Sequence, residues 1–134
     1  MTILEIIANI PRQSRYHLKG ETRTVNKRDL LKGSSDSLLL CLIGQQPMYG
    51  YQIVKEMEAR SQGYFKFKEG TLYPALHRLE KEGLITGTWQ TLANGRQRRY
   101  YHITEKGLIA MAEERSQWLD YLSAINLIMK PASD

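Results

Sequence analysis

The sequence has little of what covalent cross-links, metal sites and membrane spans are built from. Its single cysteine, Cys41, excludes a disulfide within the chain. Cys41 lies in the apolar run LLLCLIG, which favours a buried thiol over a nucleophile. The three histidines are far apart and share no ligand spacing, so we expect no metal site. No apolar run approaches the ~20 residues of a membrane span.

Catalytic constellations are missing as well. The sequence has no carboxylate pair, no serine or cysteine with a histidine at characteristic spacing, and no glycine-rich phosphate loop. We therefore expect neither an enzyme nor a bound cofactor. The start MTILEIIANIP has no basic residue before its short apolar run and no small-residue cleavage site. A secretory signal is therefore not expected, and we predict a cytoplasmic protein.

What the chain does have is an uneven excess of positive charge. Its 134 residues suit one domain, and 19 lysines and arginines against 14 acidic residues give a formal charge of +5. The excess lies before Glu105, and acidic residues outnumber basic ones from there to the end. This distribution favours a body that contacts a polyanion and a last segment with another role.

Residues 1–33 form an N-terminal extension. Four isoleucines between Ile3 and Ile10 share one helical face, which predicts a short amphipathic helix that ends at Pro11. Residues 11–33 are polar and basic. They are consistent either with a flexible linker or with an arm that contacts DNA.

Two helices are predicted next. In SSDSLLLCLIG, Ser34 or Ser35 is expected to cap a helix that Gly44 ends. This helix is apolar nearly all round, so it should be central. QQPM is a turn, and YGYQIVKEMEARSQG is a second helix with an apolar inner stripe and Gly63 after its end. The segment YFKFK is then a short extended link.

A third helix is predicted in EGTLYPALHRLEKEGLI, residues 69–85. Leu72, Leu76 and Leu79 recur at helical spacing, and Gly83 follows the helix. Pro74 is tolerated only near the start of a helix, where its missing N–H matters least. On a helical wheel the face opposite the leucines carries Pro74, His77, Arg78 and Lys81.

A β-hairpin is predicted in LITGTWQTLANGRQRRYYHIT. Asn94-Gly95 favours a two-residue type I′ turn, which needs positive φ at both positions. Arg96 and Arg98 would then share one face, and Arg99 would lie on the other with Tyr101. The expected register pairs Leu92 with Gln97, Thr91 with Arg98 and Trp89 with Tyr100.

A long final helix is predicted from Thr104, which caps it, to a stop before Pro131. Its apolar positions follow three- and four-residue steps. One small domain cannot cover so long a stripe, so we expect the same helix of a second copy to pack against it. The alternative is packing onto its own domain. The predicted dimer contacts are Met111, Trp118, Leu122, Ile125 and Met129.

Three helices followed by a basic hairpin are typical of a winged helix-turn-helix. We predict an α+β, mainly helical fold, with that domain over residues 34–104 and a dimerisation helix over 105–130. The third helix should enter the major groove of double-stranded DNA, and the hairpin tip should reach phosphates. Arg78 and Lys81 are expected to bind phosphates, and Arg78 or His77 to reach base edges.

Three stretches carry a family resemblance. LLKGSSDSLLLCLIGQQPMYGYQI, KEGTLYPALHRLEKEGLI and GRQRRYYHITEKG closely resemble the PadR family of bacterial transcriptional regulators, over about residues 30–129. The resemblance implies a homodimer formed through the last helix and repression at inverted-repeat operators. The single final helix is similar to that of the shorter PadR subgroup. Residues 1–29 have no counterpart and are open to interpretation as a DNA-contacting arm, an added dimer element or a vector-derived remnant.

The DNA-contacting GTLYP motif of this family falls on residues 70–74. Leu72 faces the core on the helical wheel, so we do not expect it to contact DNA. Thr71 and Tyr73 offer hydroxyls near the helix start, where free N–H groups favour phosphate. Lys68 replaces the small capping residue common in relatives, which adds charge at the DNA face. The expected DNA contacts are Lys68, Gly70, Thr71, Tyr73, Pro74, His77, Arg78, Lys81, Arg96, Arg98 and Arg99.

Two questions stay open. Some similar proteins bind planar aromatic compounds between their dimerisation helices through a tryptophan that matches Trp118. Trp118 is therefore interpreted either as a contact for a small aromatic effector or as a plain interface residue. The competing function is a winged-helix module that binds protein and not DNA. Such a module should present apolar or acidic groups on the outward face of the third helix, where this sequence has basic ones.

Overall fold

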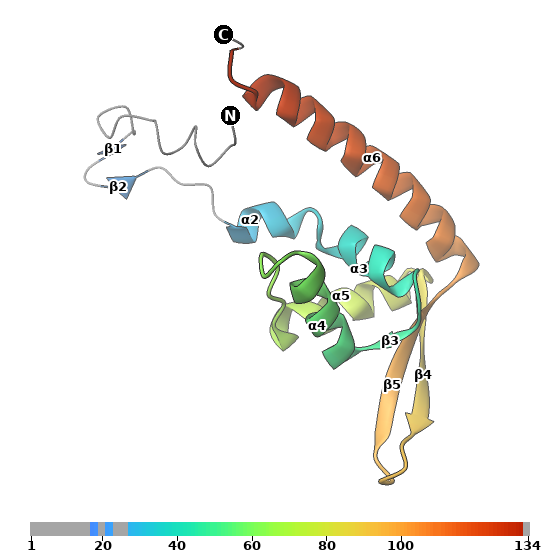
Figure 1. Ribbon diagram of the computed structural model, residues 1–134. Coiled ribbons are helices and arrows are strands. Elements are labelled where there is room, and N and C mark those ends of the chain that lie inside the picture. The colour runs from blue at the N-terminus through green and yellow to red at the C-terminus, as the bar shows by residue number, and fades with distance from the viewer. Residues whose placement is uncertain (1–16, 19–20, 23–26, 133–134) are drawn as a thin grey trace.

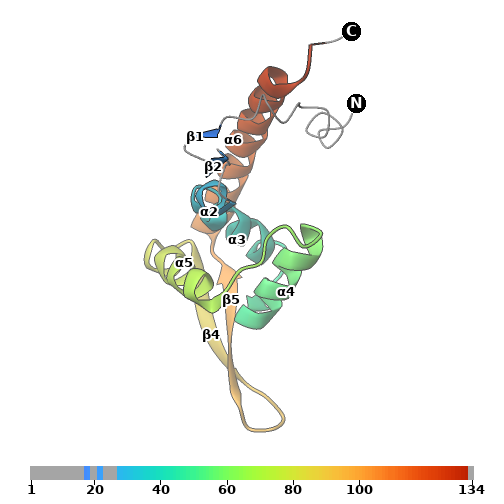
Figure 2. The same cartoon turned by 90° about the vertical axis from the view of Figure 1, so that its left-hand side faces the viewer.

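The structure, a computed structural model, describes residues 17–18, 21–22 and 27–132 (Figure 1). A helical body carries a projecting hairpin at one end and a long helix at the other, which confirms the predicted winged helix-turn-helix (Figures 1 and 2). The helix expected over residues 3–10 lies outside the described residues. The elements are β1 (His17–Leu18), β2 (Glu21–Thr22), α2 (Lys27–Lys32), α3 (Ser35–Ile43), β3 (Met48–Tyr49), α4 (Gly50–Arg60), α5 (Glu69–Lys81), β4 (Ile85–Thr91), β5 (Gln97–Ile103) and α6 (Glu105–Met129).

Helix α3 is the centre of the body, as its apolar composition predicts. It contacts α4, α5, α6 and β5. Leu39 and Leu40 are fully buried, and each such side chain contributes about 1.5–3 kcal/mol when it leaves water. The other large side chains that are almost completely buried come from α3 itself, β3, α4, α5 and β4: Ile43, Met48, Ile53, Leu72, Leu76, Leu79 and Ile85.

The start of α3 differs from the prediction. Ser34 does sit at the N-cap, but its side chain makes no capping bond to α3. Its hydroxyl donates instead to the carbonyls of Leu30 and Leu31, at 3.4 and 3.3 Å, in the last turn of α2. Helix α2 itself was not expected, because residues 11–33 were interpreted as a linker or an arm. The backbone of Ser34 stays helical, so α2 runs almost directly into α3.

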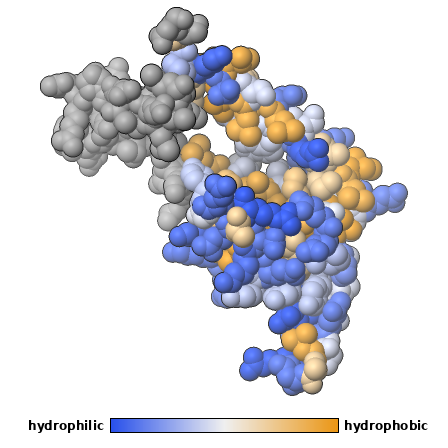
Figure 3. All heavy atoms as spheres, viewed as in Figure 1, coloured by the Kyte–Doolittle hydropathy of each residue, from blue (hydrophilic) through white to orange (hydrophobic). Residues whose placement is uncertain are grey.

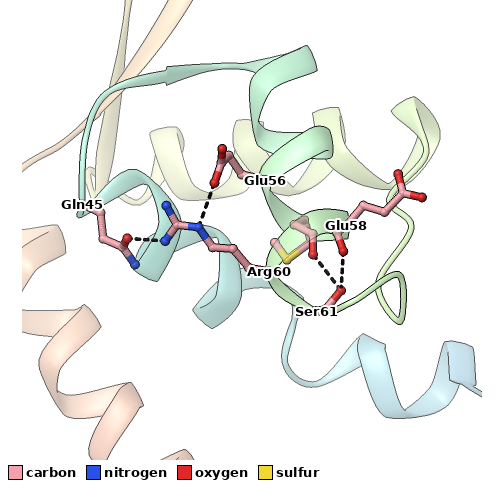
Figure 4. A network of polar contacts seen from close by, with 6 residues as sticks. Gln45, Glu56, Glu58, Arg60 and Ser61 are labelled. Atoms are coloured by element: carbon pink, nitrogen blue, oxygen red, sulfur yellow. Dashed lines mark hydrogen bonds and ion pairs between the residues drawn. The ribbon is translucent and has the colours of Figure 1, made fainter.

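The turn after α3 is tied to the end of α4 (Figure 4). The Gln45 side-chain oxygen accepts a hydrogen bond from the guanidinium of Arg60, which also pairs with Glu56 at 2.8 Å. Ser61 donates to the carbonyl of Met57 at 2.7 Å. The bond between Gln45 and Arg60 joins the turn after α3 to the end of α4, whereas the other two contacts lie within α4 and its C-cap.

The sheet has a third strand that the sequence did not predict. Its order is β3-β5-β4, all antiparallel, and β3 pairs Met48 with Tyr101 and Tyr49 with Tyr100. Two residues are too few to show the alternating pattern of a strand in the sequence, so β3 is recognised only by its pairing with β5. Strand β3 fastens the inner end of the hairpin to the start of α4.

The predicted register of the hairpin is wrong by one residue. Of the two residues Asn94 and Gly95, only Gly95 has a positive φ, +84°, so the turn is not type I′. The Leu92 amide donates to the Arg96 carbonyl at 2.7 Å, which encloses a three-residue loop ending in the left-handed Gly95. A type I turn plus such a glycine is the next most common hairpin connection. The observed pairs are Thr91 with Gln97, Gln90 with Arg98 and Trp89 with Arg99.

Helix α6 begins where predicted and is anchored at its start. The Thr104 hydroxyl accepts the Gly107 amide at 3.0 Å and donates to the Gly83 carbonyl at 2.6 Å. A Cβ on Gly107 would overlap the Leu84 carbonyl oxygen, so only glycine allows this close approach. Beyond α3 the helix leaves the body and extends away from the hairpin (Figures 1 and 2).

Candidate nucleic-acid interface

Helix α5 divides into a buried and an exposed face, as the helical wheel predicts. Leu72, Ala75, Leu76 and Leu79 are buried to 1% exposure or less. Burial of Leu72 agrees with its exclusion as a DNA contact. The opposite face lies in solvent, and the residues expected there are exposed: Pro74, His77, Arg78 and Lys81. Thr71 and Tyr73, the hydroxyl residues near the helix start, are exposed as well.

The first turn of α5 has unsatisfied polar groups. Lys68 is exposed at the N-cap, and its side chain makes no capping bond. Its carbonyl accepts the amides of Thr71 and Leu72, both at 2.9 Å. Pro74 lies inside the helix, four residues after Gly70, so the Gly70 carbonyl has no helical N–H partner. The start of α5 therefore offers both free amides and a free carbonyl to a ligand.

Tyr73 connects this end of α5 to the start of α4. Its hydroxyl lies above Gly50, where an added Cβ would be 2.7 Å away. A cavity of about 410 Å³ opens beside it, between the start of α4 and the hairpin. Aromatic and basic side chains line it, chiefly Tyr49, Tyr51, Tyr73, Trp89, Arg98 and Arg99.

The three outward-facing candidates of α5 differ in their surroundings. His77 and Lys81 are exposed and make no hydrogen bond or ion pair with the rest of the described chain. Arg78 pairs with Asp36 in the first turn of α3, at 3.0 Å. Both partners are well exposed, and such a pair is worth only ~0–1 kcal/mol. Arg78 is thus held loosely, while His77 and Lys81 are free.

The hairpin places its first two arginines differently. Arg96 is exposed beside the turn, and its amide donates to the Asn94 side chain at 3.0 Å. Arg98 stacks over the ring of Tyr49, with the guanidinium carbon 3.9 Å from the ring centroid. A hydrogen bond with Tyr100 is the main reason that the pKa of Arg98 is raised. Arg98 therefore remains charged and lies close to the start of α4.

Arg99 faces the body and not the outer side of the hairpin. Its guanidinium pairs with Glu80 of α5 at 2.6 Å and lies beside the rings of Trp89 and Tyr101. The Arg99 guanidinium is therefore occupied by Glu80, although Arg99 also lines the cavity beside Tyr73. Burial raises the pKa of Tyr101, and the nearby Arg99 charge partly offsets this effect.

Comparison with known proteins identifies the family. Residues 39–113 match the model of the Transcriptional regulator PadR-like family. The chain belongs to this family. A PadR-like transcriptional regulator from Bacillus cereus has a similar structure, with a TM-score of 0.68 and 34% identity over 78% of this chain and 99% of that one. A regulator from Clostridium thermocellum gives a TM-score of 0.69 and 31% identity, over 76% and 99%.

Two relatives extend this finding at the level of sequence. An uncharacterized protein from Lysinibacillus sphaericus is 35% identical over 104 residues, which are 78% of this chain and 95% of that protein. A transcriptional regulator from Mycobacterium tuberculosis is 45% identical over 51 residues, or 38% and 47% of the two chains. The protein is thus a DNA-binding transcriptional regulator of the PadR family.

In this PadR-like chain the first half of α6 packs on its own domain. Met111 is half-buried against the core. The indole N–H of Trp118 donates to the Ser37 hydroxyl of α3 at 3.1 Å, and Ser37 donates to Glu114 at 2.6 Å. The Trp118 ring meets Tyr121 edge to face, with 5.6 Å between centroids. The tryptophan is therefore anchored within the chain through its polar edge.

The second half of α6 presents apolar side chains that the described part of the chain leaves largely exposed. Leu122 is 53% exposed, Met129 is 77% exposed, and Ile125 is half-buried. Apolar atoms are visible along α6, whereas the face of the body is mostly hydrophilic (Figure 3). A cavity of about 390 Å³ lies against this helix, lined by Gln117, Trp118 and Tyr121.

Some site residues escaped the sequence analysis. Tyr51 is exposed on the first turn of α4, and the MYGYQI stretch was a signal for it. Two arginines that were expected to bind DNA form ion pairs, Arg78 with Asp36 and Arg99 with Glu80. Nothing in the local sequence indicated these pairs. Within the described residues, no group of three His, Cys, Asp or Glu side chains is placed to hold a metal. No helix of that part of the chain is long and apolar enough to cross a membrane.

Proposed function

We propose that this PadR-family regulator is a repressor that binds an inverted-repeat operator as a homodimer. In each protomer α5 would lie in the major groove and the β4–β5 hairpin, the wing, would follow the adjacent backbone. The exposed face of α5 carries this proposal, because it combines free basic and hydroxyl groups on a helix whose other face is fully buried. Occupation of the operator would block transcription.

The surroundings of each side chain suggest its role. Lys81 is free and basic, so it contacts phosphate. His77 and Thr71 lie on the exposed face nearer the helix start and are the candidates for base edges. Arg78 exchanges its exposed pair with Asp36 for DNA, because a bond to phosphate is at least as strong as that pair. Lys68, Tyr73, Arg96 and Arg98 contact the backbone, and Gly70 and Pro74 let it approach closely.

The uncovered half of α6 supports the homodimer. Two copies of the stripe that contains Leu122, Ile125 and Met129 can cover each other across a two-fold axis. Such a dimer places two copies of α5 on one side, which matches the symmetry of an inverted repeat. In this proposal residues 34–104 bind DNA, residues 105–130 dimerise, and residues 1–33 are an extension.

A small planar aromatic effector fits the cavity beside Trp118. The indole N–H is already bonded to Ser37, so a ligand would meet the ring face and the Tyr121 ring. Stacking on these rings would wedge the two α6 helices apart and release the operator. Quenching of Trp118 emission by such a ligand, retained in a Trp89→Phe variant, is the expected signal. Emission that stays unchanged across a library of phenolic and cationic aromatic compounds would contradict it.

Selection of bound fragments from random DNA tests the main proposal. We expect two half-sites in inverted orientation, with centres about one helical turn or a multiple of it apart. Sedimentation of the protein alone should show a dimer. Enrichment of unrelated sequences, or of single half-sites bound by a monomer, would contradict the proposal. The alternative of a module that binds only protein receives no support, because the chain belongs to a family of DNA-binding regulators.

A further inference from the structure

One carboxylate joins the groove helix to both strands of the wing. Glu80, in the last turns of α5, pairs with Arg99 of β5 at 2.6 Å. The same Glu80 oxygen accepts the amide of Gly87 in β4 at 3.2 Å. Arg99 and Gly87 lie on different strands, so this single group fixes the wing to α5 from two sides.

The arrangement is partly shielded from water and needs a glycine. The side chains of Glu80 and Arg99 are each only 29% exposed. The Arg99 guanidinium crosses directly over Gly87, where an added Cβ would lie 2.6 Å from its Cζ and Nη2 atoms. A side chain at residue 87 would therefore have to displace the Arg99 guanidinium from its present path to Glu80.

We infer that Glu80, Arg99 and Gly87 form a positioning device that sets the angle between α5 and the wing for operator binding. Arg99 is then a positioning residue that acts through Glu80, and it is not one of the phosphate contacts. This inference rests on the proposed function, because it assumes that α5 and the wing bind the same half-site.

The geometry of the wing makes this angle important. Asn94 at the tip lies seven residues along the chain from Gly87, which is roughly 23 Å at about 3.3 Å per residue. A tilt of about 10° at the base would move the tip by roughly 3–4 Å. Hydrogen bonds to phosphate tolerate only a few tenths of an ångström. Loss of the device should therefore weaken binding although no contacting group is removed.

Operator affinity and its salt dependence test the inference. We expect Glu80→Gln to weaken operator binding roughly tenfold, which is typical when one member of a coupled network is changed. This loss is expected even though the removal of a negative charge near DNA would by itself strengthen binding. Arg99→Ala should weaken binding similarly and leave the salt slope unchanged, whereas loss of a phosphate contact lowers the slope by about 1. The reciprocal variant Glu80→Arg/Arg99→Glu should recover only the part of the affinity that depends on the ion pair, because an arginine at position 80 cannot accept the Gly87 amide.

Gly87→Ala is the sharpest variant, because it removes no charge and should only push Arg99 away from Glu80. We expect Gly87→Ala to weaken operator binding as much as Glu80→Gln does. Thr86→Ala, on the exposed side of the same strand, is the control. Thermal unfolding of every variant checks that the fold is intact. Unchanged or tighter binding by Glu80→Gln, or a lower salt slope for Arg99→Ala, would overturn the inference.

Lys81→Ala separates this outcome from failure of the proposed function. If Lys81→Ala lowers both affinity and slope while Glu80→Gln and Gly87→Ala bind normally, only the positioning device is refuted. If the unmodified protein binds no operator, the proposed function fails, and the inference falls with it.

Discussion

Truncation of Leu122 to alanine should weaken the dimer by a predictable amount. Complete burial of a leucine side chain contributes about 1.5–3 kcal/mol, and 53% of Leu122 is exposed in the single chain. Covering that half is therefore worth about 1 kcal/mol. A two-fold interface contains the residue twice, so Leu122→Ala should cost ~2 kcal/mol. This corresponds to a roughly 30-fold rise in the dimer Kd.

Sedimentation equilibrium over a range of protein concentrations measures this Kd directly. Asp120→Asn is a matched control, because Asp120 is exposed on the opposite side of α6, about 160° from Leu122. Its effect should stay within ~0.5 kcal/mol, as for other surface substitutions. Equal Kd values for the two variants, or a protein that remains monomeric at all concentrations, would refute burial of this stripe in a dimer.

Three further predictions concern single side chains. Lys81→Ala should weaken binding to all DNA sequences and lower the salt slope by about 1 in fluorescence anisotropy titrations; an unchanged slope would remove Lys81 from the phosphate contacts. Gly50→Ala should displace Tyr73 and reduce operator affinity, with little change in the unfolding temperature; equal affinity would show that the position of Tyr73 is immaterial. Burial raises the pKa of Cys41, so its thiolate fraction at pH 7.5 is below that of a free cysteine. Its alkylation should therefore be slower in the folded protein than in urea, and equal rates would contradict this.

Periodicity was sufficient to predict α3, α4, α5 and α6, although it did not predict the short helix α2. The leucines of α5 and the run in α3 are buried where the sequence puts them, because helical spacing alone decides which side chains share a face. The cap of α6 at Thr104 was equally local, since its bond to Gly107 spans three residues. These features depend only on residues that are close together in the sequence, so they could be predicted from the sequence alone.

Features that depend on distant partners could not be predicted. Strand β3 is defined by its pairing with β5, and the hairpin register followed a three-residue loop where the Asn94-Gly95 rule favoured two. The pairs of Arg78 with Asp36 and of Arg99 with Glu80 join residues on separate elements. Counting basic residues on a face cannot reveal such pairs, so Arg99 was assigned to the DNA surface with its neighbours.

The anchored start of α6 relates dimer geometry to DNA binding. Thr104 and Gly107 hold α6 against the carbonyls of Gly83 and Leu84, in the short link between α5 and β4. Lys106 adds a bond to the Glu82 carbonyl at 2.8 Å. One junction therefore fixes α6 relative to both the groove helix and the wing. In the proposed homodimer, the angle at which two α6 helices cross would therefore determine the separation of the two copies of α5, and hence the half-site spacing that the dimer can bind.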